Sequence, residues 1–372
     1  MKRFVPVIEF QAYLSNKCVC ILLAFAALGA FVFVGCDTGP PQRQSPFYWG
    51  TNAVLYDAQD VDLIGSLGNP GKVGARVTLY WSDVEPTPGN WQFTVYDGLV
   101  KRAASVQIPI LGILAYAMKR VAGAAASMQG TPWALSFCPP DDVEDFATFA
   151  AKVVARYPAV LYWEIWNEPN TVNFWRPSPD PVRYVELLKR SYAAIKAANP
   201  MAVVVLGGLS PGTGSGQVNT MNAASFLEAV YQNGGKNYFD AVGFHPYNGG
   251  VSPDLYLADY VNSVHDVMKQ YEDGNKEVWV TEIGWFVGTQ ADALSETDQA
   301  DYLSRAFTIL HNLEFVERVY WYNLRDYGNQ APVNQPPPSV CGPIAGTPVD
   351  YGLFRVDGSP RPAADAFKKS LQ

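Results

Sequence analysis

The sequence predicts a single (β/α)8 barrel of the TIM type, and three observations support this fold class. Eight short runs rich in Val, Ile, Leu and aromatic residues follow one another after residue 46. Segments with helical periodicity separate these runs, as in a parallel barrel. The alternation fills about 325 residues, a normal length for such a barrel, with no internal repeat and no second domain. No Gly-rich nucleotide motif follows the first run, so a doubly wound nucleotide-binding sheet lacks support.

The eight predicted strands are almost continuously apolar, as strands buried on both faces should be. They lie at 49–54, 74–80, 108–114, 159–166, 202–208, 240–246, 277–283 and 318–324.

Helical periodicity is clearest between the later strands. In 142–157 and in 257–271, apolar residues recur every three or four positions, which indicates one buried face. Ser295 and Asp298 in "SETD" form an N-terminal capping signal for the next helix. The segment "RPAADAFKKSL" predicts a closing helix at the C-terminal end.

Residues 1–36 do not fit the barrel pattern. Lys2, Arg3 and Lys17 precede the apolar run "CVCILLAFAALGAFVFVG", and "FVGC" resembles a bacterial lipobox that ends at Cys36. Residues 37–46 then read as a polar, Pro-rich tether to the domain at 47–372. We expect an exported, membrane-anchored lipoprotein first, an uncleaved membrane anchor second and simple secretion third.

Export affects the interpretation of the cysteines. Cys138 and Cys341 remain in the folded part, where they could form a disulfide in an oxidising compartment or stay as two thiols. The net charge of −8 without a basic run argues against a nucleic-acid partner, and we expect a monomer. Aromatic residues make up 13% of the chain, which core packing explains as well as ligand binding does.

Two glutamates lie four residues apart on the fourth predicted strand. Strand alternation places Glu164, Trp166 and Glu168 on the inner face, with Glu164 about 13 Å below Glu168. Active sites of such barrels lie at the C-terminal ends of the strands. Glu168 is therefore the reactive candidate, and we expect Glu164 to be a buried structural carboxylate held by an inward Arg or by backbone donors.

A second carboxylate, Glu282, ends the seventh strand, and the same alternation places Val278 and Val280 inward below it. Two carboxylates that flank a barrel mouth are the minimal apparatus of glycoside hydrolysis. One must be protonated to donate to the leaving oxygen, and the other must be ionised to attack or to activate water. The sequence therefore predicts Glu168 and Glu282 as the catalytic pair.

Other strand ends carry candidate supporting residues. Arg76 could keep a carboxylate ionised, His245 and Tyr247 share one face after the sixth strand, and Trp321 could form a platform beneath a sugar ring. Each also has a purely structural explanation, as an ion-pair partner or as core packing. Further aromatic residues could serve as platforms or as packing, namely Trp81, Tyr116, Trp133, Trp175 and Trp285.

Two competing hydrolase classes have weaker support. A metal-dependent barrel needs clustered ligands, whereas this chain has three His, two of them in predicted helices. A Ser-His-Asp hydrolase needs a G-x-S-x-G elbow after a strand, and the sequence has none. We therefore expect no metal and no cofactor.

The motifs "IWNEPN", "VTEIGW", "FHPY" and "YWYN" together resemble glycoside hydrolase clan A. Within the clan the chain is most similar to family thirty-nine and to related bacterial exopolysaccharide-associated hydrolases. The segments "RVTLYWSDVEPTPGNWQF" and "YGLFRVDGSPRPAADAF" extend the similarity over most of 47–370. The resemblance implies a (β/α)8 glycosidase.

Carried over to this chain, the resemblance implies Glu168 as general acid/base and Glu282 as nucleophile. It also implies that Asn167 contacts the sugar 2-hydroxyl, that Arg76 and Tyr247 support the nucleophile, and that anomeric configuration is retained. Residue patterns alone leave retention and inversion open, because they do not fix the carboxylate separation. The alternative is a non-catalytic surface glycan-binding protein on a degenerate barrel.

Overall fold

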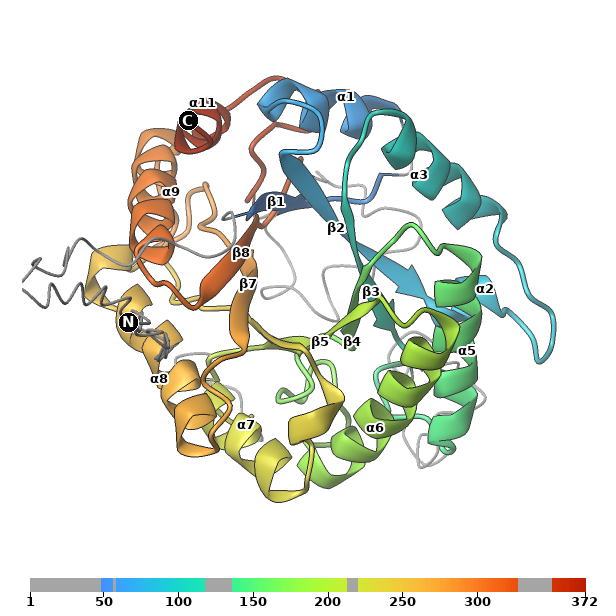
Figure 1. Ribbon diagram of the computed structural model, residues 1–372. Coiled ribbons are helices and arrows are strands. Elements are labelled where there is room, and N and C mark those ends of the chain that lie inside the picture. Colours follow the sequence, from blue (N-terminus) through green and yellow to red (C-terminus); the bar gives the residue numbers. More distant parts are fainter. Residues whose placement is uncertain (1–47, 56–57, 118–135, 213–219, 327–349) are drawn as a thin grey trace, which may run out of the picture. The chain divides into compact units, whose positions relative to one another are not determined.

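The domain is a closed barrel of eight parallel strands surrounded by helices, as predicted (Figure 1). The computed structural model describes residues 48–55, 58–117, 136–212, 220–326 and 350–372. Each strand pairs with the next, and β8 pairs with β1, which closes the barrel. The strands are β1 Tyr48–Asn52, β2 Val73–Tyr80, β3 Ile110–Ala115, β4 Tyr162–Ile165, β5 Val203–Leu209, β6 Ala241–Phe244, β7 Glu277–Ile283 and β8 Val316–Trp321.

All eight predicted strands are present, and β7 has the predicted bounds, whereas the ends of the other strands differ from the prediction by one to three residues. Strand β4 stops at Ile165, because Trp166 and Glu168 adopt positive φ angles of 70° and 43° and leave the extended conformation. Strand β8 begins at Val316, two residues before the predicted start. The turn after Ile165 changes the direction of the Trp166 side chain, whereas the earlier start of β8 changes none.

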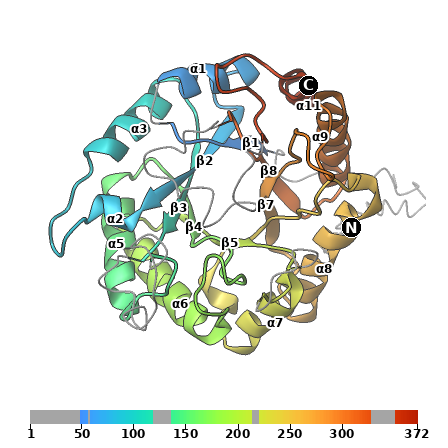
Figure 2. The ribbon, with the colours of Figure 1, turned by 180° about the vertical axis from the view of Figure 1, so that it is seen from behind.

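The helices cover the outside of the barrel, as both views show (Figures 1 and 2). The predicted amphipathic segments form α5 and α8, and Ser295 caps α9 by accepting a hydrogen bond from the Asp298 backbone N–H at 3.1 Å. The helices and 3-10 turns are α1 Ala58–Leu67, α2 Trp81–Val84, α3 Thr94–Ser105, α5 Val143–Arg156, α6 Pro181–Ala198, α7 Ala223–Gln232, η2 Lys236–Tyr238, η3 Pro253–Leu255, α8 Leu257–Gln270, α9 Glu296–His311 and α11 Pro362–Ser370.

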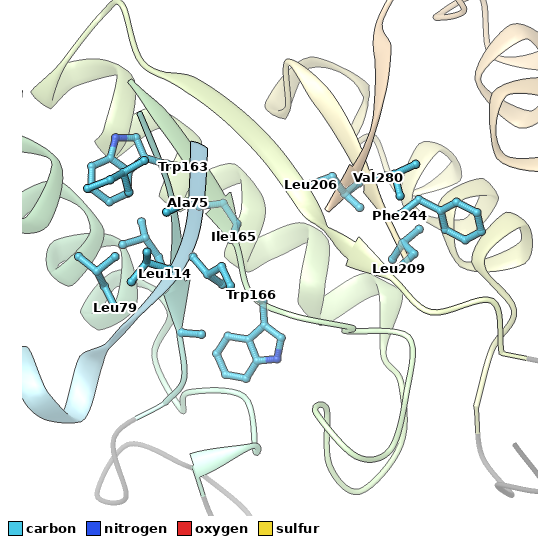
Figure 3. Close-up of a cluster of buried hydrophobic side chains, with 14 of the residues drawn as sticks. Ala75, Leu79, Leu114, Trp163, Ile165, Trp166, Leu206, Leu209, Phe244 and Val280 are labelled. Atoms are coloured by element: carbon cyan, nitrogen blue, oxygen red, sulfur yellow. The ribbon is translucent and has the colours of Figure 1, made fainter. Parts of the chain in front are cut away.

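Two apolar clusters fill the domain. The smaller one, which we call the interior cluster, takes one side chain from each of five strands, and residues of five strands can meet only inside the barrel. Its members are Leu111, Val205, Ala241, Trp279 and Tyr320. The larger cluster lies between strands and helices, and Figure 3 shows part of it, with Trp163 and Trp166 beside Leu114 and with Val280 beside Phe244.

Four side chains that were predicted to point inward face the helices instead, namely those of Val278, Val280, Trp321 and Trp166. Trp279 points inward, so Val278 and Val280 face the helices, the reverse of the prediction. Tyr320 also points inward, and Trp321 packs outward within 6.4 Å of Phe307 on α9. The side chain of Trp166 faces α5 rather than the interior, with its ring 5.8 Å from that of Phe146.

One arginine joins the two described ends that flank residues 327–349. Arg361 is 4% exposed and forms ion pairs with Asp326, with Asp350 at 3.3 Å and with Glu296 of α9 at 3.1 Å. The same guanidinium donates to the Gly352 carbonyl, and the Gly352 N–H donates to Asp326. Both ends are therefore fixed to α9 and to the start of α11.

Several predictions fall on residues outside the described ranges, namely the leader, the tether, Cys36 and Cys341. Cys138 lies within them and is buried. Because Cys341 lies outside the described ranges, a disulfide between the two stays a prediction. None of the helices within the described ranges combines the length and apolar character needed to cross a bilayer.

Candidate active site

Arg76 on β2 is the centre of a buried polar network at the C-terminal ends of the strands, the end we call the mouth. Its Nε and Nη2 donate to Glu164 at 2.7 and 3.2 Å, and its Nη1 donates to Glu282 at 2.5 Å. A single guanidinium therefore bridges Glu164 and Glu282.

The predicted depth of Glu164, about 13 Å below Glu168, was wrong, because the chain turns after Ile165 rather than continuing as a strand.

Glu164 is the structural carboxylate that the sequence predicted. Its side chain is fully buried and accepts hydrogen bonds from Arg76, from the Gly208 N–H at 2.6 Å and from the Thr281 hydroxyl at 3.2 Å. A carboxylate with a bidentate Arg and two further donors has its charge compensated. Glu164 thus holds Arg76 in place beneath the mouth.

Glu282 ends at the mouth, where its side chain is 14% exposed. Besides Arg76, the Tyr247 hydroxyl donates to its second oxygen at 3.0 Å. Burial raises the pKa of Glu282, while the charge of Arg76 and the hydrogen bonds from Arg76 and Tyr247 oppose that rise. Burial, and after it the charge of Glu282, raises the pKa of Tyr247 well above its usual range, so the tyrosine keeps its proton and donates.

Glu168 faces Glu282 across the mouth. Its backbone N–H donates to the Gly208 carbonyl at 3.0 Å, which anchors the turn after β4. Its Oε1 lies 3.0 Å from His245 Nδ1, and Glu282 Oε2 lies 3.8 Å from the same nitrogen. The two carboxylate oxygens are therefore at most about 6.8 Å apart, and each side chain is 14% exposed.

His245 links Glu168 to the network below. The ring is fully buried, with Nδ1 toward Glu168 and Nε2 3.0 Å from the Thr281 hydroxyl. Burial lowers the pKa of His245, and the charge of Arg76 lowers it further, against the raising effect of Glu168. Gly208 makes room for the ring, because a Cβ there would lie 2.0 Å from His245 Nε2.

Two amides complete the site around Arg76. Its Nη2 donates to Asn167 Oδ1 at 2.9 Å, and its Nη1 donates to Asn52 Oδ1 at 2.8 Å. Since Arg only donates, both amide oxygens must face the guanidinium. The Asn52 NH2 group donates to the carbonyl oxygens of Thr281 and Trp321.

The structure brings together six of the residues that the sequence selected. They are Glu168, Glu282, Arg76, Asn167, His245 and Tyr247. Trp321 is not among them, because it is fully buried behind β8 with Nε1 donating to the Tyr351 carbonyl at 3.0 Å. The platform prediction for Trp321 was therefore wrong.

The other suggested platforms are also packing residues wherever the structure describes them. Trp81 is fully buried, Trp175 and Trp285 are each 1% exposed, and Tyr116 is 7% exposed. Trp133 lies outside the described residues. Rings without accessible faces cannot stack on a sugar, so the structural interpretation of these aromatics holds.

Three residues at the mouth were missed by sequence reasoning, namely Thr281, Asn52 and Tyr322. Thr281 was overlooked because alternation was counted from Glu282, whereas the pairing of β7 with β8 shifts between Val280 and Ile283. Tyr322 continues the inward series of Tyr320 and packs 5.4 Å from the Tyr351 ring, beside Tyr247. Counting alternation from β8 as observed would have selected it.

Two facing carboxylates at the ends of β4 and β7 of a (β/α)8 barrel define the class of barrel glycoside hydrolases. Within the described ranges, no three His, Cys, Asp or Glu side chains gather in a way that could hold a metal ion. A family model described as glycosyl hydrolase catalytic core matches residues 142–336. The chain belongs to this family. The family match confirms the glycoside hydrolase assignment drawn from the motifs.

Solved structures share the barrel. A family 39 glycoside hydrolase from Bacteroides cellulosilyticus WH2 superposes with a TM-score of 0.64 at 24% identity, covering 88% of this chain and 63% of that one. A family 39 β-xylosidase from Caulobacter crescentus gives 0.64 at 19% identity, over 89% and 71%. A family 10 endo-β-1,4-xylanase from Gloeophyllum trabeum gives 0.57 at 18% identity, over 88% and 96%.

These neighbours agree with the clan A resemblance at the level of the fold. The chain spans less than two thirds of the length of the Bacteroides structure. No curated protein matches the sequence.

Proposed function

We propose that this protein is a retaining glycoside hydrolase that cleaves β-glycosidic bonds of a polysaccharide or oligosaccharide by double displacement. The observation that carries the proposal is the shared position of Glu168 and Glu282, whose oxygens lie 3.0 and 3.8 Å from one His245 nitrogen. Retaining enzymes need carboxylates roughly 5–5.5 Å apart, and inverting enzymes roughly 6.5–9.5 Å. The upper bound of about 6.8 Å covers the retaining range and excludes all but the lower end of the inverting one.

In this proposal Glu282 attacks the anomeric carbon while Glu168 transfers its proton to the departing glycosidic oxygen. The carbon–oxygen bond to the leaving group breaks, and a bond to the Glu282 carboxylate forms. Water then attacks the same carbon, gives its proton to Glu168, and releases Glu282. No metal or cofactor enters either step.

The supporting residues have roles that follow from their contacts. Arg76 and Tyr247 hold Glu282 in the orientation needed for attack and favour its ionised form. Asn167 is held by its oxygen, and among the described residues its NH2 group has no acceptor, so it can donate to substrate. A hydroxyl beside the anomeric carbon is the substrate group that this donor would meet.

The direct test replaces each carboxylate by its amide. Glu282→Gln should lower turnover by about 10⁴-fold or more, because the covalent step loses its nucleophile. Glu168→Gln should lower it by about 10²–10⁴-fold on natural linkages, with a much smaller loss in the first step for dinitrophenyl glycosides, whose leaving group needs no proton. Release of reducing ends and of dinitrophenol measures both effects on a panel of β-xylosides, β-glucosides and β-linked polysaccharides.

Controls separate the proposal from its alternatives. Glu314→Gln changes an exposed carboxylate and should leave turnover unchanged. NMR of the first product should show the β-anomer, and an α-anomer would replace retention by inversion. Binding of glycans without release of new ends across the panel would favour the non-catalytic glycan-binding alternative.

We further propose that the domain is exported and tethered to a membrane through Cys36, on the basis of the lipobox-like "FVGC" and the polar segment after it. Cys36→Ser should then move the protein from the membrane fraction to the soluble fraction of cells. Unchanged membrane association would favour an uncleaved anchor.

A further inference from the structure

A buried chain of hydrogen bonds runs from Glu168 to Glu164. Glu168 Oε1 contacts His245 Nδ1 at 3.0 Å, His245 Nε2 contacts the Thr281 hydroxyl at 3.0 Å, and that hydroxyl contacts Glu164 Oε1 at 3.2 Å. His245, Thr281 and Glu164 are all fully buried. Water therefore cannot replace a partner that points the wrong way, and the chain must have a defined direction.

The direction is set at the Glu164 end. Glu164 receives two N–H groups of Arg76 and the Gly208 N–H, so it is ionised and can only accept. Thr281 must therefore donate its one hydroxyl proton to Glu164. The Thr281 oxygen is then left to accept, and the proton between Thr281 and His245 belongs to Nε2.

The surroundings of His245 favour its neutral form. Glu164 and Glu168 from β4 and the segment after it, Arg76 from β2, Glu282 from β7, and Tyr247 after β6 are the charged and titratable groups that face the ring. Glu164 and Glu282 are both paired with Arg76, and burial lowers the pKa of His245. A neutral imidazole with its proton on Nε2 has only a lone pair at Nδ1.

We infer that Thr281 and Glu164 are positioning residues for the acid, because they oblige His245 to accept at Nδ1 and so place the proton of that contact on Glu168. This inference rests on the proposed function in taking Glu168 as the acid/base. The proton on Glu168 is then determined by Thr281 and Glu164, which lie on the opposite side of the histidine ring and which substrate does not reach.

The same direction of the hydrogen-bond chain matters between the two chemical steps. After Glu168 has given its proton to the leaving group, its carboxylate faces the Nδ1 lone pair, and the contact joins two acceptors. Taking a proton from the attacking water restores the hydrogen bond. The chain therefore favours return of the proton to Glu168, and His245 itself is never required to gain or lose one.

The tautomer can be measured without any substrate. The chain has three histidines, so a two-dimensional ¹H–¹⁵N spectrum of histidine-labelled protein is simple, and His265→Gln and His311→Gln assign the other two. We expect His245 to show a protonated Nε2 and an unprotonated Nδ1 between pH 5 and 8. An imidazolium, or a proton on Nδ1, would overturn the inference even if the hydrolase is active.

Substitution of Thr281 tests the consequence for catalysis. In Thr281→Val the Nε2 proton loses its acceptor, so the Nδ1–H tautomer becomes available and donates to the Glu168 carboxylate. The alkaline limb of the kcat/KM profile should then move down by about one pH unit. Thr281→Ser keeps the hydroxyl and should restore the profile, and Thr308→Val on the exposed face of α9 should match the unmodified protein.

Coincident alkaline limbs for Thr281→Val and the unmodified protein would contradict the inference. Should Thr281→Val fail to fold, the histidine spectrum of the unmodified protein still decides the matter. Should no glycan be hydrolysed, the proposed function fails, and the spectrum reports on the hydrogen-bond chain independently.

Discussion

The barrel interior contains a buried arginine near each end. Arg76 is bound by carboxylates and amides, whereas Arg318 packs mainly against aromatic rings and has one longer contact, 3.5 Å, with Glu317 Oε1. Arg76, toward the mouth, is held by Glu164 and Glu282 and by amide oxygens at 2.5–3.2 Å. Arg318, toward the base, lies over the rings of Tyr48, Tyr162 and Trp279 at 4.8, 4.1 and 4.5 Å. Both side chains are almost fully buried.

The difference shows what each end of the barrel requires. Ring faces attract a cation without demanding one orientation of its N–H groups, so Arg318 can act as packing for the base. Carboxylates and amides demand a defined orientation, and Arg76 in turn fixes theirs. Arg318 therefore contributes to the stability of the base, whereas Arg76 fixes the orientation of the side chains at the mouth.

The largest effect should come from replacing the two arginines by methionine. Arg76→Met leaves Glu164 buried without its cation, which should cost about 3–5 kcal/mol in the free energy of unfolding and abolish hydrolysis. Arg318→Met keeps the packing against the rings and should cost about 1–2 kcal/mol with activity retained. Urea denaturation and turnover measure both, and equal losses in the two variants would contradict the comparison.

A smaller effect should separate the two ends by pH. At the base, burial and the neighbouring Glu277 raise the pKa of Glu317 from its ordinary 4.5 to about 7, and both carboxylates accept from Trp279 Nε1. Because the folded pKa lies above the unfolded one, the stabilisation is complete below pH 4.5 and is lost as the pH rises through 7.

Glu317→Gln mimics the protonated form and should remove this dependence. Its melting temperature should match that of the unmodified protein near pH 5 and exceed it above pH 7, as followed by circular dichroism. The exposed variant Glu314→Gln should follow the unmodified protein throughout. A Glu317→Gln protein that is no more stable at pH 8 would show that the pair does not titrate in this range.

The sequence was sufficient for the barrel and for the residues whose position depends only on strand order. The apolar runs located all eight strands, and strand ends located Glu168 and Glu282 at one mouth. These inferences need only the rule that parallel strands share one C-terminal edge. They did not depend on details of the backbone.

Side-chain direction within a strand was less predictable, because a single irregularity reverses the alternation. Positive φ at Trp166 turned that side chain toward α5, and the shifted pairing of β7 with β8 before Ile283 accompanies the exchange of Val280 for Thr281. Asn52 was missed for another reason. Its partners Thr281 and Trp321 are more than two hundred residues away in the chain, and no local pattern connects them.

The ion pairs of Arg361 with Asp326 and Asp350 suggest how relatives of this protein could diversify. One guanidinium holds Asp326 and Asp350, so the stretch between them begins and ends at anchored positions whatever its composition. Exchange of that stretch between homologues would then leave its two anchored ends in place. Swapped versions that keep Asp326, Asp350 and Arg361 offer a route to new sugar preferences on an unchanged scaffold.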